Sequence, residues 1–306
     1  MDRDVWTNLM AAVDRAIAKL KPTGRKPTYS HRLIAGMYFW SAWHNQSLSW
    51  ACDREHYNGG LFRPRGALPS ISRFSRRVKE PMFQRLLQLV HDDLAASGLS
   101  SPVLYVDGKP LTVSPVSKDP DARRGHVTGG FAKGYKLHAY VTERRRITVW
   151  SVTALNVAEQ SVAAALSEYL PAAPSPDALA MGDSNFDAAP LHKALGARGW
   201  PLLTPLKAQQ RVKDGRHHPV TLRQMGPERR AAVAVDRACP DLKRLVLKGR
   251  NNVEGTFSVL AAAGLSYALP TFVRRLPRVT RWVGAKIILY HARLLAQEQA
   301  AARAAA

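Results

Sequence analysis

The sequence predicts an α/β protein in which an all-helical N-terminal region precedes a mixed β-sheet flanked by helices. Apolar residues recur at helical spacing through residues 1–99, whereas short runs of β-forming residues alternate with helical segments from residue 100 onward. The chain has 306 residues, of which 46% are hydrophobic, enough for one large or two ordinary domains. We therefore expect a helical region over 1–99 and an α/β domain over 100–306.

The charge balance points to a polyanionic partner. The sequence has 45 Lys and Arg residues against 23 Asp and Glu residues, which gives a formal net charge of +22. A field of that sign attracts nucleic acid first and an acidic membrane surface second, and no basic amphipathic anchor helix stands out. A generally arginine-rich composition is the alternative. We therefore expect nucleic acid as the partner.

Cysteine use and the hydrophobic runs bear on the cellular compartment. Cys52 and Cys239 form no CxxC pair, which argues against a disulfide framework or a thiolate zinc site and suits a reducing compartment. No run approaches the roughly 18 uninterrupted apolar residues of a membrane span, and the N-terminus lacks the pattern of a secretory signal. We expect a cytoplasmic, nucleoid-associated protein.

The helical region includes a segment with a helix-turn-helix-like pattern. Residues 47–56 and 68–79 predict two short helices around an elongated turn. The apolar face of the second helix consists of Ile71, Phe74 and Val78. Its basic positions project elsewhere and are Arg73, Arg76, Arg77 and Lys79. Such residues can reach phosphates and guanine edges, so we expect them to contact DNA, with a solvated arginine face as the alternative.

The α/β part begins with Val103-Leu-Tyr-Val-Asp-Gly-Lys109, a stretch whose apolar run ends in the carboxylate of Asp107. It fits a buried strand better than a helix, which needs at least about ten periodic residues. Further strands are expected at 135–141, 147–154, 178–182 and 200–204, with helices at 158–170 and 188–197. We expect Lys109–Val113 to turn back beside the first strand, and the polar, basic and glycine-rich stretch 117–134 to form a mobile loop beside the carboxylate site.

This order of elements is the ribonuclease-H-like arrangement, an antiparallel meander whose first strand is central, followed by right-handed crossovers. In that arrangement the ends of the first and fourth strands lie side by side. The fourth strand closes on Asp183, so Asp107 and Asp183 would be neighbours. The helical stretch Arg250–Leu260 carries a third carboxylate, Glu254.

Three carboxylates placed in this way suit phosphodiester chemistry. Two Mg²⁺ ions about 4 Å apart can activate the attacking oxygen, stabilise the leaving oxygen and offset the charge that develops between them. Such ions prefer hard oxygen ligands, usually one or two carboxylates each. We therefore expect Asp107, Asp183 and Glu254 to form one metal site.

Each carboxylate also has an ordinary structural explanation. Asp107-Gly108 between two apolar runs could form a type I′ hairpin turn. Asp183 or Asp187 could cap the next helix, and Glu254 could pair with Arg250 one turn earlier. The rival carboxylates for a place in the site are Asp119, Asp121, Glu159 and Asp187.

Five short motifs follow one another along the chain. They are Val106-Asp-Gly-Lys109, Gly134-Tyr-Lys-Leu-His138, Thr153-Ala-Leu-Asn156, Gly182-Asp-Ser-Asn-Phe-Asp187 and Arg250-Asn-Asn-Val-Glu-Gly-Thr-Phe257. In order and spacing they resemble the DDE-type transposases of bacterial insertion sequences over nearly the whole chain. The resemblance implies Asp107, Asp183 and Glu254 as the catalytic triad with two Mg²⁺ or Mn²⁺ ions, and DNA contact by Arg250. The other basic residues expected to contact DNA are Lys109, Lys136 and His138.

The resemblance implies a transposase that binds the terminal repeats of its element, cleaves double-stranded DNA and joins the freed 3′-hydroxyl to target DNA. Synapsis of two ends implies a homodimer on DNA. The alternatives are an inactive relic retained as a DNA-binding protein and a ribonuclease-H-like nuclease that cuts without joining. The sequence departs from the family pattern at Leu247 and Ala261, where many members carry tyrosine and lysine. Either Lys286 or the basic insertion 205–249 supplies the missing DNA contact, or this copy is a decayed one.

Overall fold

The computed structural model describes residues 2–21, 27–98, 100–205, 209–211, 217–219, 225–262 and 268–306. The chain forms two compact units, one comprising Met1–Ala96 with Val259–Ala306 and the other Ser97–Ser258. The sequence predicts residues 259–306 as part of the α/β domain. They belong instead to the helical unit, because the long C-terminal helix packs on the N-terminal helices.

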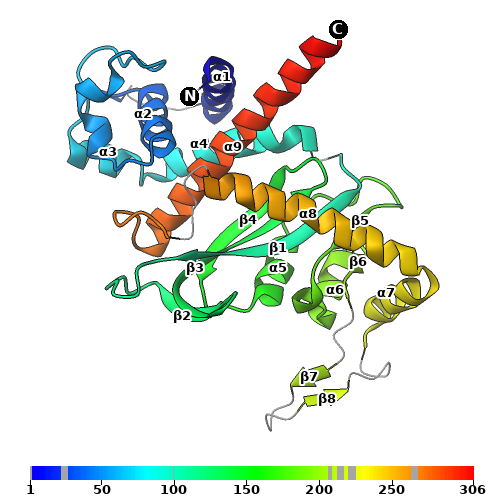
Figure 1. The fold of residues 1–306 in the computed structure, drawn as a ribbon. Coiled ribbons are helices and arrows are strands. Elements are labelled where there is room, and N and C mark those ends of the chain that lie inside the picture. The colour runs from blue at the N-terminus through cyan, green and yellow to red at the C-terminus, as the bar shows by residue number, and fades with distance from the viewer. Residues whose placement is uncertain are drawn as a thin grey trace. The chain divides into compact units, whose positions relative to one another are not determined.

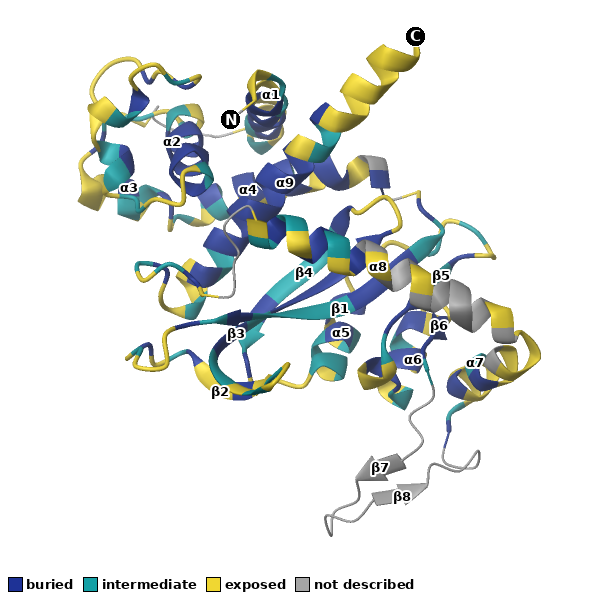
Figure 2. Ribbon diagram, viewed as in Figure 1, coloured by how far each residue is buried: buried dark blue, intermediate teal, exposed yellow. Residues whose placement is uncertain are grey.

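The main helices of the first unit are α1 (Arg3–Leu20), α2 (His31–Trp43), α3 (Ile71–Arg77), α4 (Pro81–Ala95) and α9 (Leu276–Ala305). Helix α9 packs against α1, α2 and α4, and its central turns are buried (Figures 1 and 2). Lys286 of α9 is buried as well and donates to the carbonyl oxygen of Ala42 and the Oδ1 atom of Asn45. Burial lowers the pKa of Lys286 to about 7. This internal position does not support the DNA contact considered for Lys286.

The segment predicted to resemble a helix-turn-helix is helical only in its second half. Its first half forms two short 3-10 turns, Trp50–Cys52 and Arg54–Tyr57. Helix α3 follows Ser70, whose Oγ accepts a hydrogen bond from the backbone N–H of Arg73 at 3.4 Å. Phe74 and Val78 are buried as predicted. Ile71 is 54% exposed, contrary to the prediction, because it is the first residue of the helix and borders a cavity described below.

The second unit is built on a mixed sheet. Its strands are β1 (Val103–Thr112), β2 (Arg123–Val127), β3 (Gly130–Thr142), β4 (Ile147–Ala154), β5 (Leu179–Met181) and β6 (Leu202–Leu203). The strand order is β2-β3-β1-β5-β6, with β4 also paired to β3. The β1–β3, β2–β3 and β3–β4 pairs are antiparallel, whereas β5 runs parallel to β1 and β6 runs parallel to β5. The predicted mixed α/β architecture is confirmed, with β1 at its centre.

Two predictions about the first strands are wrong. Strand β1 continues straight through Asp107 and Gly108 to Thr112, because all of these residues pair with β3, so no hairpin turn forms there. The stretch predicted as a loop contains the β2–β3 hairpin. A Cβ atom on Gly134 would lie 2.3 Å from the carbonyl oxygen of Leu111, so only glycine allows β3 to pass β1 this closely.

Helices flank the sheet in the second unit. They are α5 (Glu159–Ser167), α6 (Ala189–Gly196), α7 (Pro227–Ala238) and α8 (Pro240–Ala262). Leu104 and Val106 of β1 share one apolar cluster with Leu166 of α5 and Leu191 of α6. Successive strand side chains alternate between faces, so Asp107 belongs to the opposite face from Val106. The core thereby fixes the direction in which β1 presents its carboxylate.

The predicted basic insertion contributes a small second sheet and α7. Strand β7 (Gln209–Arg211) pairs antiparallel with β8 (His217–Pro219). The other residues between Leu206 and Gln224, on which much of the DNA-facing prediction falls, lie outside the described residues. Within the described part of the chain, no helix is long and apolar enough to cross a membrane.

Candidate active-site groove

Strands β1 and β5 bring Asp107 and Asp183 to one place. Val103 pairs with Leu179 and Tyr105 with Met181 in parallel register, so the chain leaves β5 beside the middle of β1. A Cβ atom on Gly182 would lie 2.9 Å from Cγ1 of Val106, which shows how closely this exit passes β1. Asp183 therefore follows directly beside the strand that carries Asp107.

Both aspartates line one open groove of about 720 Å³. The other walls are the β2–β3 hairpin, with Arg124, His126 and Phe131, and the N-terminus of α5, with Glu159. Phe131 is 72% exposed, and its ring lies 5.6 Å from that of His126. The basic, glycine-rich character of the stretch 117–134 predicts a mobile loop beside the site. The stretch does line the groove, but as a hairpin, and the sequence did not single out Arg124, His126 or Phe131. The groove thus combines carboxylates with a basic, aromatic rim.

Local hydrogen bonds hold both aspartates. Asp107 Oδ1 accepts from the backbone N–H of Gly108 at 2.8 Å. Asp183 Oδ1 accepts from the backbone N–H of Asn185 at 2.7 Å and caps the 3-10 turn Ser184–Phe186. The structure therefore shows the predicted alternative, a capping role, for the Oδ1 atom of Asp183. Asp183 caps the turn and lines the groove at the same time.

Glu159, one of the rival carboxylates, also lies in the groove. Its Oε1 atom is 2.7 Å from Nζ of Lys136, and their side chains are only 17% and 11% exposed. Oε1 would lie 2.6 Å from a Cβ atom on Gly108, so a larger residue there would displace it. Lys136 is thus engaged within the protein, which does not support the DNA contact predicted for it.

Two other rivals have structural roles. Asp187 is buried and accepts two hydrogen bonds of 2.6 Å from Arg229, while Nε2 of His192 lies 3.3 Å from its Oδ1. Asp119 is buried and accepts a hydrogen bond of 2.7 Å from the Tyr135 hydroxyl. Arg229 belongs to α7, so this residue of the basic insertion supports the fold. No sequence signal linked Arg229 to Asp187.

Glu254 lies on α8 in the same compact unit as the two aspartates. It is exposed, and this turn of the helix lies near Arg145, whose guanidinium is 3.7 Å from a Cβ atom built on Gly255. Glu254 does not line the groove. No three His, Cys, Asp or Glu side chains in the described part of the chain are placed to hold a metal ion. The convergence of Glu254 with the aspartates therefore stays a prediction, and the side chains of Arg250 and Leu247 lie outside the described residues.

The remaining residues predicted to contact DNA differ in accessibility. His138 is only 2% exposed, its Nε2 lies 2.8 Å from Thr153 Oγ1, and burial together with Lys136 lowers its pKa to about 4. Such a neutral, internal ring does not support a DNA contact. Lys109 is half-buried, and burial lowers its pKa.

The three arginines of α3 also differ from one another. Arg77 pairs with Glu80, and its guanidinium lies 3.2 Å from Nδ1 of His31. Arg73 and Arg76 are exposed. Of this set, Arg73 and Arg76 are the residues best placed to meet DNA.

Comparison with known proteins identifies the class to which this fold and groove belong. The family model described as "Transposase DDE domain" matches residues 98–290, and the chain belongs to that family. Among solved structures, the chain is similar to a piggyBac transposase, whose synaptic complex with hairpin DNA was determined by cryo-electron microscopy. The two chains are 10% identical with a TM-score of 0.44, over 97% of this chain and 73% of the other. No curated protein matches the chain.

Proposed function

We propose that this protein is a DNA transposase that cleaves phosphodiester bonds at the ends of an insertion element and joins the freed 3′-hydroxyl to target DNA. The observation that carries the proposal is the meeting of Asp107 and Asp183 in one open groove of a transposase-family chain. The two residues are far apart in sequence and come from neighbouring parallel strands. Asp107 lies within β1 and Asp183 just after β5, and carboxylates gathered in this way are what metal-assisted strand cleavage requires.

The sheet order supports a ribonuclease-H-like catalytic domain. The antiparallel series β1, β3 and β4 places the first of these strands at the centre, and β5 and β6 then add in parallel on its other side. In addition to that series, β2 pairs with the first residues of β3 and forms the β2–β3 hairpin.

Asp107, Asp183 and Glu254 would hold two Mg²⁺ or Mn²⁺ ions. The donor set fits, because these ions take hard oxygen ligands and usually one or two carboxylates each. When bound, the ions would supply an activated water, stabilise the leaving oxygen and offset the charge on the phosphate. The groove already gathers the two aspartates, and Glu254 would complete the set from α8.

Side chains in the groove would balance its charge and contact the DNA. Lys136 neutralises Glu159, which keeps this fourth carboxylate from adding repulsion towards a phosphate. Arg124 and His126 stand on the rim, where they can contact the DNA backbone. Exposed Phe131 can pack against a base or sugar near the cleaved bond.

The partner would be double-stranded DNA, namely the terminal repeats of the element and the target. The net charge of +22 favours such a polyanion. Arg73 and Arg76 of α3 would contribute to binding in the helical unit. Because two element ends must be brought together before joining, we propose that the protein acts as a homodimer on DNA.

The test is nicking of supercoiled DNA by the purified protein in Mg²⁺ or Mn²⁺, followed by strand transfer from oligonucleotides that carry element ends. The native chain is compared with Asp183→Asn and with Asp177→Asn, a matched control because Asp177 is exposed and does not line the groove. Metal-dependent nicking that is lost only in Asp183→Asn supports the proposal. Equal nicking by all three proteins would contradict it.

The same experiment separates the two alternatives. Nicking without strand transfer would identify a nuclease. DNA binding that is steeply salt-dependent, with no cleavage in either metal, would identify an inactive, DNA-binding relic.

A further inference from the structure

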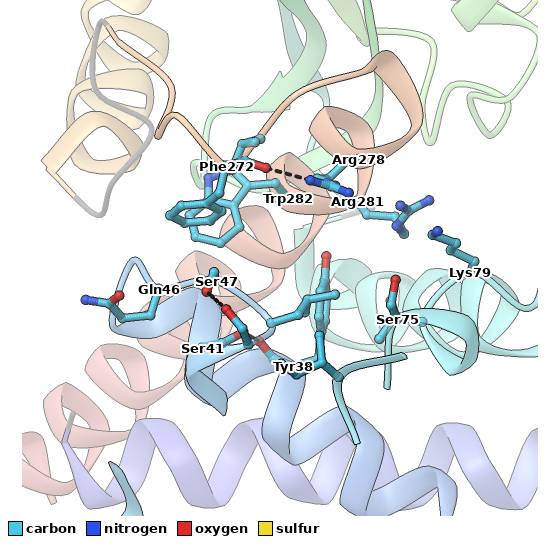
Figure 3. Close-up of a pocket in the computed structure, with 15 residues that line it drawn as sticks. Tyr38, Ser41, Gln46, Ser47, Ser75, Lys79, Phe272, Arg278, Arg281 and Trp282 are labelled. Atoms are coloured by element: carbon cyan, nitrogen blue, oxygen red, sulfur yellow. Dashed lines mark hydrogen bonds between the residues drawn. The ribbon is translucent and has the colours of Figure 1, made fainter. Parts of the chain in front are cut away.

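A second concave site lies wholly within the helical unit (Figure 3). A cavity of about 270 Å³ opens between α2, α3 and the first turns of α9. Three basic side chains line it, namely Lys79, Arg278 and Arg281, together with three aromatic ones, namely Tyr38, Phe272 and Trp282. None of the described residues that line it is acidic. The cavity therefore has the composition of a site for an anion attached to a flat, apolar group.

The basic residues lie together along one side of the cavity in Figure 3. Arg278 donates a hydrogen bond of 2.8 Å to the carbonyl oxygen of Phe272, which holds its side chain against this wall. Burial lowers the pKa of Arg281, and neighbouring Arg278 lowers it further, whereas Tyr38 acts in the opposite direction. A bound anion would offset the repulsion between these two guanidinium groups.

The aromatic wall can accept a flat ring. Phe272 is half-buried, and its ring meets that of Trp282 edge to face at a centroid distance of 5.4 Å and an angle of 84°. Trp282 holds this ring in place from a buried position.

Neutral polar groups complete the lining. Ser47, Ser75 and Gln46 can each donate or accept hydrogen bonds at the remaining sides of the cavity. The volume is close to the lower end of the roughly 300–1,000 Å³ range of small-molecule pockets. It suits one base with its phosphate better than a larger ligand. Exposed Arg73 and Arg76 belong to α3, which also lines the cavity through Ile71.

We propose that this cavity binds one unpaired nucleotide of DNA, with its phosphate at Lys79, Arg278 and Arg281 and its base against the ring of Phe272. The combination of cations for the backbone with an aromatic surface for the base is how proteins hold unstacked nucleotides. That the nucleotide belongs to DNA rests on the proposed transposase function. The pocket would give the helical unit a grip on distorted or single-stranded DNA in addition to its phosphate contacts.

The test measures binding of the full chain to three fluorescent duplexes, by anisotropy and without divalent metal. One duplex is fully paired, one has a single unpaired thymidine, and one has an unpaired abasic residue at the same position. We expect the thymidine duplex to bind about 5- to 150-fold more tightly than the abasic duplex, which is the range for stacking of one base. Equal binding of these two duplexes would overturn the proposal.

Two variants locate the effect. Phe272→Leu keeps an apolar side chain and should remove the difference between thymidine and abasic duplexes. Arg281→Gln should weaken binding of both unpaired duplexes relative to the fully paired one. The matched control is Arg274→Gln, which removes the same charge from an exposed residue that does not line the cavity, and it should retain the thymidine preference. Thermal unfolding of each variant establishes that it is folded, and a preference retained in folded Phe272→Leu would contradict the assignment.

Two further comparisons are needed. One distinguishes a nucleotide of DNA from a free nucleotide, and the other distinguishes failure of this inference from failure of the proposed function. Binding of 5′-dTMP alone as tightly as the thymidine duplex would show that the cavity serves a free nucleotide and would overturn its assignment to DNA. Because binding is measured without metal, loss of the thymidine preference in a protein that still nicks DNA overturns this inference alone. A protein that prefers the unpaired thymidine yet never nicks DNA overturns the proposed function and leaves the pocket in place.

Discussion

Two aspartates four residues apart, Asp183 and Asp187, occupy opposite environments. Asp183 lines the open groove beside Asp107, whereas Asp187 is buried and held by Arg229, 42 residues further along the chain. Both belong to the same motif, and nothing in their local sequence distinguishes them. A cation from the chain's own fold, here Arg229, turns Asp187 into a structural group. Asp183, which faces the groove and accepts a backbone hydrogen bond, stays available for a ligand.

The largest effect is expected when the structural aspartate is removed. Asp187→Ala leaves the buried guanidinium of Arg229 without its partner, and breaking a buried pair in this way costs about 3–5 kcal/mol. Urea unfolding should show this loss in the free energy of unfolding. Asp177→Ala, at an exposed position, should change it by less than about 0.5 kcal/mol. A loss of under about 1 kcal/mol in Asp187→Ala would remove the distinction between the two aspartates.

The opposite pattern is expected for the groove aspartate. Asp183→Asn should reduce metal-dependent nicking about 1,000-fold, equivalent to about 4 kcal/mol, because a metal ligand that offsets charge in the transition state is lost. Its stability should stay within about 0.5 kcal/mol of the native chain, since asparagine caps a helical turn about as well as aspartate. Nicking rates and urea unfolding measured on the same preparations check both halves. Normal nicking in Asp183→Asn would be incompatible with the proposed site.

Buried His138, in the core of the sheet, should make the stability of the protein depend on pH. His138 has a pKa of about 4 in the folded protein, below its ordinary value of about 6.5, because burial disfavours the charged ring. The unfolded chain therefore binds the proton more readily than the folded one. The folded protein has its full stability above about pH 6.5 and becomes less stable as the pH falls towards 4. Its free energy of unfolding should fall by about 3 kcal/mol over this interval.

Unfolding measured between pH 4 and 7 tests this expectation. His138→Gln removes the titrating group and retains a side chain that can bond to Thr153, so its stability should vary less over the same interval. Identical pH dependence in the two proteins would show that His138 is not responsible.

The smallest effect is expected at the second buried aspartate. Tyr135→Phe removes the hydroxyl that donates to Asp119 and should cost about 1.5–3 kcal/mol, the usual worth of a hydrogen bond to a charged group. Nicking measured well below the unfolding temperature should not change, because neither residue lines the groove. Reduced nicking by fully folded Tyr135→Phe would place Asp119 among the catalytic groups.

Much of the fold could be predicted because its signals are local. The run from Val103 to Asp107 has the β-forming residues and length of a buried strand, and the structure confirms a strand there. The hairpin signal of Asp107-Gly108 was misleading, since pairing with β3 on one side and β5 on the other outweighs turn propensity. The β2–β3 hairpin escaped prediction because its stretch is polar and rich in glycine.

The candidate site was predictable in part. The order of the strands is enough to bring Asp107 and Asp183 together, because β5 pairs with the first half of β1 and ends beside the position of Asp107. The partners of Asp187 and Glu159 could not be predicted. Arg229 and Lys136 reach these carboxylates through tertiary packing, which leaves no periodic signal in the sequence. The same holds for the buried state of His138, which sequence similarity to a DNA-contacting motif could not reveal.

The central claim is that the aspartates of the groove bind divalent metal, and direct counting of bound Mn²⁺ tests it. Free Mn²⁺ is titrated by electron paramagnetic resonance against the native chain, Asp183→Asn and Asp177→Asn. Binding by the native chain and Asp177→Asn, with loss in folded Asp183→Asn, is the predicted result. Equal Mn²⁺ binding by all three proteins would contradict the claim.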